Sequence, residues 1–303
     1  MLGCVYHVTL ATMTEVQKGF FAALAASAIW GGMYVVSRIV LEVIPPLPLV
    51  ALRMLISALF IFGLYLLLRR ELCIPKSAWS RVAVMGIVGY VVSISAQFIG
   101  TKLAGAALGS LITTASPLFT VAIAALFGLE KVAPRAWLGL GLGMVAVYLL
   151  SGVSGGGDAT GALWLVLAAF TWGVLGVVGG QTVAKLDAFA VTAWASLIGW
   201  IGTSALIPLE TSPIRFEAIN LPVILGILYL GIVSTAVAFA LWVYGVSRAG
   251  SVLSGIAFFA QPVVGSLLGA LLLNEKLNSS FIIAAGLLFF GAWLARPINK
   301  DVT

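Results

Sequence analysis

The apolar positions of this chain form long blocks separated by short polar connections, without the two-residue alternation typical of a strand. A helix needs about 20 mostly apolar residues to cross the hydrocarbon core of a bilayer. The pattern therefore predicts an all-α polytopic membrane protein with ten transmembrane helices. They are expected at about 18–41, 48–68, 82–101, 107–128, 134–152, 160–183, 189–208, 220–245, 252–273 and 279–296.

The composition agrees with this pattern. Of the 303 residues, 62% are hydrophobic and 9% are charged, and the mean hydropathy is +1.17. A soluble domain carries about a quarter charged residues. So few charges cannot cover a water-facing surface, which makes an integral membrane protein the expected class.

Several kinds of chemistry are excluded by residue types that the chain lacks. It has one histidine, His7, and two distant cysteines, Cys4 and Cys73, so no metal site, disulfide framework or cofactor is expected. No nucleophile–base set or pair of acids lies within the spans, so the chain is not expected to be an enzyme. A channel is disfavoured because no charged or carbonyl-rich filter motif is present.

The charge distribution predicts the orientation. Eleven Lys and Arg residues fall on one side and five on the other, with Arg38 and Arg53 among the five. Cytoplasmic loops collect basic residues, so both termini are placed in the cytoplasm, as tails 1–17 and 298–303. The same rule explains the net charge of +6 without a nucleic-acid partner. No signal peptide is predicted, and Met13 is an alternative start to Met1.

The chain repeats itself at a shift of 145 residues. Pro117 falls on Pro262, Gly105 falls on Gly250, and the pair 130–131 falls on 275–276, both Glu-Lys. We therefore expect two five-helix repeats, 18–152 and 160–297, joined by a Gly-rich connector at 153–159. An odd number of helices per repeat inverts the second repeat, which is a recurrent plan among transporters.

The motifs Ala-Ile-Trp-Gly-Gly at 28–32 and Phe-Thr-Trp-Gly-Val at 170–174, with a mid-helix proline and a later Glu-Lys in each half, carry a resemblance. The chain resembles the EamA family of the drug/metabolite transporter superfamily, and more narrowly the bacterial aromatic amino-acid exporters. The resemblance implies a bacterial inner-membrane carrier of small metabolites, with a small-molecule substrate and lipid as its partners, as a monomer or homodimer.

The ten acidic residues all fall in loops, tails or helix ends. Proton-coupled carriers commonly use an intramembrane carboxylate or histidine, so facilitated transport driven by the substrate gradient is expected. The basic residues nearest the midplane, Arg38 and Arg53, are placed toward the outer ends of their spans. An uncharged chamber that binds a zwitterion or neutral amphipath is therefore predicted.

Polar and aromatic residues at helical spacing suggest the walls of that chamber. Tyr90, Ser93 and Gln97 share one expected helix face, and lipid would not tolerate Gln97. Interhelical hydrogen bonds and interfacial aromatic belts are the alternatives. The predicted substrate-binding residues are Trp30, Tyr34, Tyr90, Ser93, Gln97, Trp172, Phe239, Trp242, Phe258 and Gln261.

Paired prolines suggest where the helices bend. Pro117 and Pro262 each remove a backbone donor, which affects the carbonyls of Thr113 and Phe258. Plain kinks or close packing are the alternative. The predicted hinge residues are Gly31, Gly32, Pro117, Gly173 and Pro262, and the fifth and tenth helices are expected to form a scaffold or dimer surface.

These observations predict export of aromatic and bulky apolar amino acids, such as phenylalanine, tryptophan and methionine, by alternating access. The alternative is an exporter of small polar metabolites such as threonine or cysteine, or of amphipathic drugs, with coupling to protons.

Overall fold

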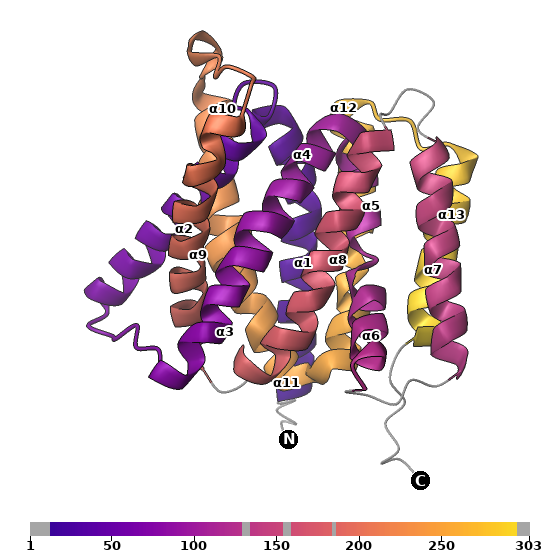
Figure 1. The fold of residues 1–303 in the computed structure, drawn as a ribbon, viewed down its shortest axis with the longest axis horizontal. Coiled ribbons are helices and arrows are strands. Elements are labelled where there is room, and N and C mark those ends of the chain that lie inside the picture. Colours follow the sequence, from indigo (N-terminus) through magenta and orange to yellow (C-terminus); the bar gives the residue numbers. More distant parts are fainter. Residues whose placement is uncertain (1–12, 129–133, 154–158, 184–185, 296–303) are drawn as a thin grey trace, which may run out of the picture.

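The computed structural model describes residues 13–128, 134–153, 159–183 and 186–295, and these residues form helices and connections without a strand (Figure 1). The predicted all-α class is therefore confirmed. Residues 1–12 and 296–303, the connector residues 154–158 and the Glu-Lys pair at 130–131 lie outside the described residues, and the predicted N-terminal tail 1–17 is too long, because α1 begins at Glu15.

The first half contains helices of very different lengths. They are α1 (Glu15–Val40), α2 (Pro46–Leu67), η1 (Lys76–Ala78), α3 (Trp79–Val84), η2 (Met85–Ser93), α4 (Ile94–Ala104), α5 (Ala106–Thr113), α6 (Ser116–Leu126) and α7 (Pro134–Val153). From η1 to α4 the chain is one continuous helical segment, Lys76–Ala104.

The second half follows a similar sequence of elements. They are α8 (Ala159–Val183), α9 (Ala188–Leu206), η3 (Ile207–Leu209), η4 (Phe216–Ala218), α10 (Leu221–Leu228), η5 (Tyr229–Val237), α11 (Ala238–Phe258), α12 (Ala260–Leu273) and α13 (Ser279–Ala295).

Five helical segments in the described part are long and apolar enough to cross a bilayer. They are Glu15–Val40, Pro46–Leu67, Lys76–Ala104, Ala188–Leu209 and Leu221–Ala249. Shorter apolar helices are Ala106–Thr120, Trp137–Ala146, Ala159–Leu175, Ala260–Leu273 and Phe281–Gly291. The count of ten spanning helices stays a prediction.

Local sequence signals set where the helices begin. Thr14 and Gln17 form a capping box at the start of α1, Asp187 accepts hydrogen bonds from two amides at the start of α9, and Asn220 caps α10. Each cap satisfies amides that have no partner in the first turn of a helix. Pro46 lies in the first turn of α2, where its missing amide costs nothing.

Two nine-residue π-helical segments occur at equivalent places in the two halves. The segment η2 begins at Met85 and η5 begins at Tyr229, 144 residues later. A π-helix is rare and usually spans a single turn, frequently at functional sites. Its i→i+5 bonding rotates the following residues relative to an α-helix, so residue spacing alone misplaces the faces of these spans.

Two helix breaks lie directly before the paired prolines. The helix α5 ends at Thr113 before Pro117, and α11 ends at Phe258 before Pro262. Thr113 and Phe258 are the two residues whose carbonyls have no amide donor because proline lies four residues later, so the sequence located the breaks. The expected span 107–128 is thus two helices. The expected connection near 245–252 is wrong, because α11 continues through it.

The helix α1 lies in the middle of the bundle, in contact with α11, α12 and η5, while α7 and α13 pack against each other at one side (Figure 1). A Cβ added at Gly291 would lie 2.6 Å from the carbonyl oxygen of Gly139, so these two helices approach closely. The start of α1 and the end of α13 lie at the same end of the bundle.

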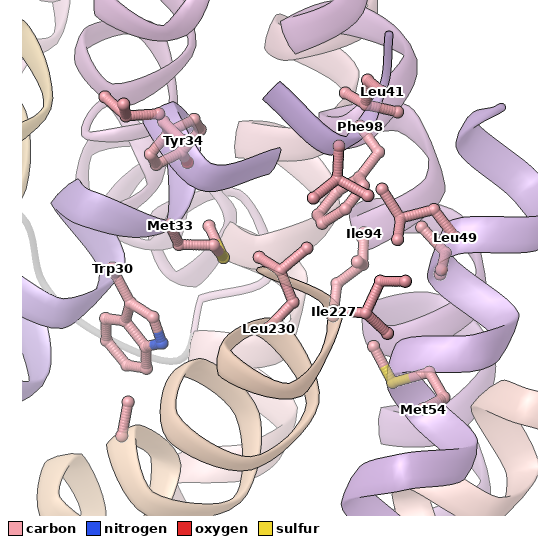
Figure 2. Packing of buried hydrophobic residues seen from close by; sticks show 14 of the residues in the cluster. Trp30, Met33, Tyr34, Leu41, Leu49, Met54, Ile94, Phe98, Ile227 and Leu230 are labelled. Carbon is pink, nitrogen blue, oxygen red and sulfur yellow. The ribbon is translucent and has the colours of Figure 1, made fainter. Parts of the chain in front are cut away.

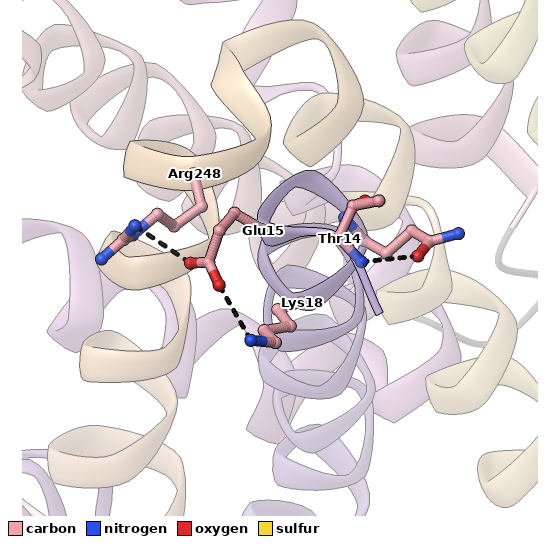
Figure 3. A network of polar contacts seen from close by, with 5 residues as sticks. Thr14, Glu15, Lys18 and Arg248 are labelled. Carbon is pink, nitrogen blue, oxygen red and sulfur yellow. Dashed lines mark hydrogen bonds and ion pairs between the residues drawn. The ribbon is translucent and has the colours of Figure 1, made fainter. Parts of the chain in front are cut away.

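The central core joins helices from both halves of the chain. Met33, Ile94 and Phe98 pack near Leu230 and Met54, and Figure 2 shows these side chains converging between the helices. At the end of the bundle where α1 begins, Glu15 pairs with Lys18 at 2.8 Å and with Arg248 of α11 at 3.0 Å (Figure 3). Both ion pairs are about half exposed, so each adds little stability.

Candidate substrate chamber

A small chamber lies between the two halves, where α1, α2, α4, α5 and α6 face α8, α11 and α12. The cavity has a volume of about 40 Å³, which is enough for roughly three water molecules. The lining residues are Trp30, Met33, Tyr34, Arg53, Ser93, Ile94, Gln97, Thr113, Ser116, Ala168, Trp172, Phe239, Phe258 and Gln261.

Eight of the ten residues predicted to bind substrate line this chamber; the two that do not are Tyr90 and Trp242. The ring of Tyr90 packs 5.4 Å from that of Phe239, and the ring of Trp242 packs 5.5 Å from that of Trp30. Both therefore lie behind the lining rings. Tyr90 leaves the face of Ser93 and Gln97 because η2 winds as a π-helix. A role in substrate binding stays a prediction for all ten residues.

One side of the chamber is an ordered chain of hydrogen bonds centred on Thr113. Gln97 Nε2 donates to the Tyr34 hydroxyl at 2.5 Å, and the Tyr34 and Thr113 hydroxyls are 2.5 Å apart. Thr113 Oγ1 donates to the carbonyl of Gly109 at 2.7 Å and accepts from Gln261 Nε2 at 3.1 Å. Since Thr113 uses its proton on Gly109, Tyr34 donates to Thr113. This chain of bonds fixes the orientation of both amides.

The helix break near Pro117 supplies this polar side. Pro117 has no amide to donate to the carbonyl of Thr113, and the Ser116 hydroxyl donates to that carbonyl at 2.5 Å instead. The carbonyl of Thr113 therefore keeps a hydrogen-bond donor, and the break orients Thr113 and Ser116 toward the chamber.

The other side of the chamber is aromatic. The ring of Trp30 lies 5.2 Å from that of Phe239 and 6.1 Å from that of Phe258, and the ring of Trp172 lies 5.6 Å from that of Phe239. Trp30 Nε1 donates to the carbonyl of Ser234 in η5 at 3.0 Å, which satisfies the indole in an apolar site. The wall can thus contact an apolar side chain on several faces.

Arg53 corrects one prediction made from the sequence. The chamber was predicted to be uncharged, yet Arg53 is 1% exposed and lines the chamber. The helix α2 begins at Pro46, so Arg53 is in its third turn, and its long side chain extends inward to Thr235. The sequence did contain a signal for this role, because a single arginine inside an apolar stretch usually marks a functional site. Arg38 does lie at a helix end, paired with Glu42 at 2.7 Å.

The predicted hinge glycines lie at close helix contacts. A Cβ at Gly31 would lie 2.5 Å from the carbonyl oxygen of Gln261, and one at Gly173 would lie 2.6 Å from Phe119 Cβ. A Cβ at Gly32 would lie 3.1 Å from the Tyr229 hydroxyl. These contacts explain why small residues are needed, and the hinge role stays a prediction.

Among the described residues, carboxylates lie away from the chamber lining. Glu275, which follows α12, accepts hydrogen bonds from the amides of Ala106 and Ala107 at 2.7 Å each, at the start of α5. The described part of the chain contains no group of three His, Cys, Asp or Glu side chains suited to a metal ion.

Comparison with known proteins identifies the family. The model of the EamA-like transporter family matches residues 17–152 and, a second time, residues 159–296. The chain belongs to the EamA-like transporter family. Its members and relatives are membrane transporters of the drug/metabolite type, so this EamA protein is a membrane transporter.

Relatives of this EamA protein extend over most of its length. An "Uncharacterized inner membrane transporter YedA" of Escherichia coli is 25% identical over 91% of this chain and 89% of its own. A "Probable amino-acid metabolite efflux pump" of Salmonella typhimurium is 27% identical over 92% of this chain and 94% of its own. An "Uncharacterized transporter" of Archaeoglobus fulgidus is 27% identical over 82% and 86%.

A solved crystal structure shares the fold of this EamA protein. It superposes with a TM-score of 0.65, at 24% sequence identity, over 91% of this chain and 97% of the other. At that identity the likeness concerns the fold alone.

Proposed function

We propose that this EamA protein exports amino acids with aromatic or bulky apolar side chains across the bacterial inner membrane, by facilitated alternating access. The observation that carries the proposal is the two-sided chamber, in which the Thr113 hydrogen-bond chain faces the aromatic wall of Trp30, Phe239 and Phe258. A zwitterion with an apolar side chain has the same two-sided character.

The proposed architecture is two inverted repeats of five spans. Three pairs of features at matching intervals support it: the π-segments starting at Met85 and Tyr229, the helix breaks after Thr113 and Phe258, and the two matches to the family model. In this plan the chamber lies at the repeat interface, where carriers of this type bind substrate.

Facilitated transport is proposed because none of the described carboxylates lines the chamber, so a buried acid that alternates between protonation states is missing from its described wall. The relative named as an amino-acid metabolite efflux pump supports the substrate class and the outward direction. The relative named as an inner membrane transporter supports the location.

Counterflow in proteoliposomes tests this proposal. Vesicles loaded with unlabelled phenylalanine should accumulate labelled phenylalanine, and an imposed pH difference should leave the initial rate unchanged. Phe239→Ala should lower that rate by about tenfold, because three ring contacts are lost. Phe290→Ala is the matched control, since Phe290 is half exposed on α13. A rate that follows the pH difference would refute facilitated transport.

One observation favours a second candidate, a smaller polar amino acid such as threonine. The free room of about 40 Å³ holds neither amino acid unless the wall rings move, but threonine needs less movement than phenylalanine because its side chain is smaller. Labelled threonine therefore belongs in the same counterflow panel. Threonine counterflow that is unaffected by Phe239→Ala, with no phenylalanine counterflow, would select this second candidate.

A further inference from the structure

The chamber contains one buried cation, Arg53 of α2. Its Nε donates to Thr235 Oγ1 at 2.6 Å, and its guanidinium carbon lies 5.2 Å from the centre of the Phe98 ring. Its Nη1 is buried without a hydrogen-bond partner among the described residues. The guanidinium is therefore held in place at Nε, while its Nη1 is open to a partner from outside the described residues.

The charge of Arg53 is not balanced by a described neighbour. The ion pairs in the described part of the chain involve other residues. The ionisable groups that interact electrostatically with Arg53 are the hydroxyls of Tyr90, Tyr34 and Tyr229, and these are neutral at physiological pH. A buried guanidinium without a counter-charge is unfavourable, so ionisable residues inside membrane proteins usually mark a functional site with an anionic or polar partner.

The π-helical segment η5 fixes the position of the guanidinium. The Thr235 hydroxyl donates its proton to the carbonyl of Leu230 at 2.7 Å, which leaves its oxygen free to accept from Arg53 Nε. The Phe98 ring below the guanidinium holds its plane. A planar fork held in this way suits the two oxygens of a carboxylate.

We propose that Arg53 binds the carboxylate of the transported amino acid in the chamber. This inference rests on the proposed function and deepens it, because it makes an α-carboxylate the group that every substrate must carry. A substrate held there supplies the counter-charge that Arg53 lacks.

Two glutamine side chains in the chamber lining can receive the ammonium group. Gln97 and Gln261 each donate through Nε2 to protein oxygens, at 2.5 Å to Tyr34 and at 3.1 Å to Thr113. Their Oε1 atoms accept no hydrogen bond from the described residues and belong to lining side chains. Two amide oxygens and a guanidinium in the lining of one chamber match the two charged groups of a zwitterion.

Binding of a ligand series to the purified protein tests the proposal. The ligands are phenylalanine, phenylalaninamide, which lacks the carboxylate charge, and 3-phenylpropionate, which lacks the ammonium group. Wild-type protein should bind phenylalanine about 10- to 100-fold more tightly than phenylalaninamide, the effect expected of one charge-assisted hydrogen-bond pair. Arg53→Met should remove this difference by weakening phenylalanine alone, and Arg53→Lys should retain part of it.

Controls separate a lost contact from a damaged fold. Arg81→Met removes an exposed arginine near the start of α3 and should leave both affinities unchanged. Arg53→Met should still bind phenylalaninamide as wild type does, which shows that the chamber is intact. Equal weakening of the acid and the amide by Arg53→Met overturns the proposal, as does an unchanged preference for the acid.

The outcomes also distinguish this inference from the proposed function. If wild-type protein binds no aromatic amino acid but binds acetate or 3-phenylpropionate in a manner that Arg53→Met abolishes, the carboxylate site stands and the amino-acid assignment fails. If chloride alone binds there and carboxylates do not compete with it, the carboxylate site is wrong.

Discussion

At the scale of single residues, Arg53 shows what the sequence could and could not predict. Its type and its place within an apolar stretch were visible, but its distance from the middle of the span gave no sign that its side chain enters the chamber. The chamber residues Trp30, Tyr34 and Gln97 were identified because Gln97 is costly when it faces lipid, and because Trp30 and Tyr34 share one helix face near the middle of a span. The side-chain direction of Arg53 depends on its neighbours in η5, which residue spacing does not encode.

Gly105 provides a prediction at this scale. It has a φ of +93° between α4 and α5, and a Cβ there would lie 2.7 Å from Glu275 Oε1. Gly105→Ala should destabilise the protein by about 1–3 kcal/mol, because both the backbone conformation and the contact become strained. Thermal unfolding in detergent measures the effect.

Gly63→Ala is the matched control for this substitution. Gly63 lies inside α2 with open space around its added Cβ, so alanine should be neutral or stabilise by up to about 1 kcal/mol. Equal unfolding temperatures for the two variants would contradict the assigned role of Gly105.

At the scale of elements, the sequence predicted the helix breaks before the prolines better than it predicted whether a segment is an α-helix or a π-helix. The breaks before Pro117 and Pro262 follow from the missing amide of proline, so residue type alone predicts them. The π-helical segments η2 and η5 have no such residue signature, and the π-helical geometry of η2 places Tyr90 outside the predicted face. The continuation of α11 through 245–252 was missed because Gly250, unlike Gly105, does not end its helix.

The contact between Glu275 and the start of α5 gives a prediction for elements. Its carboxylate accepts from the amides of Ala106 and Ala107, where the helix dipole favours a negative charge. Glu275→Gln should make hydrogen exchange at these two amides about 5- to 30-fold faster, which corresponds to a loss of about 1–2 kcal/mol of local stability.

The exposed Glu217 of η4 offers a matched control. Glu217→Gln should leave exchange at Ala106 and Ala107 unchanged. Unaltered exchange in Glu275→Gln would mean that the carboxylate does not stabilise α5.

At the scale of the whole molecule, the all-α class and the transporter family were predictable from the sequence. Hydrophobic block length gives the class, and the motifs at 28–32 and 170–174 gave the family. The number of spans and their orientation depend on the bilayer, so they stay predictions. The free room in the chamber could not be predicted, because it depends on how the rings of Trp30, Trp172 and Phe239 pack.

Cys73 can report the orientation, because it is exposed in the connection between α2 and η1. In a Cys4→Ser background, a membrane-impermeant maleimide should label Cys73 in inverted vesicles and not in intact cells, if this end of the bundle is cytoplasmic. The hydrogen bond and negative charge of Glu71 raise the pKa of the Cys73 thiol, so labelling should accelerate as the pH rises.

Glu71→Gln is the internal check on that reaction. Removing the negative charge lowers the pKa of Cys73, so the thiolate fraction and the labelling rate at neutral pH should increase. Labelling of Cys73 in intact cells would contradict the predicted orientation.

Protection of a cysteine in the chamber by substrate tests the central claim most directly. In a Cys4→Ser, Cys73→Ser background, Ser93→Cys places a thiol on the chamber wall, and Ser57→Cys places one in the buried contact between α2 and α9. A small methanethiosulfonate reagent should label Ser93→Cys during turnover, phenylalanine should slow that labelling, and Ser57→Cys should stay unlabelled. Labelling of Ser93→Cys that neither phenylalanine nor threonine slows would contradict the assignment of this chamber as the substrate site.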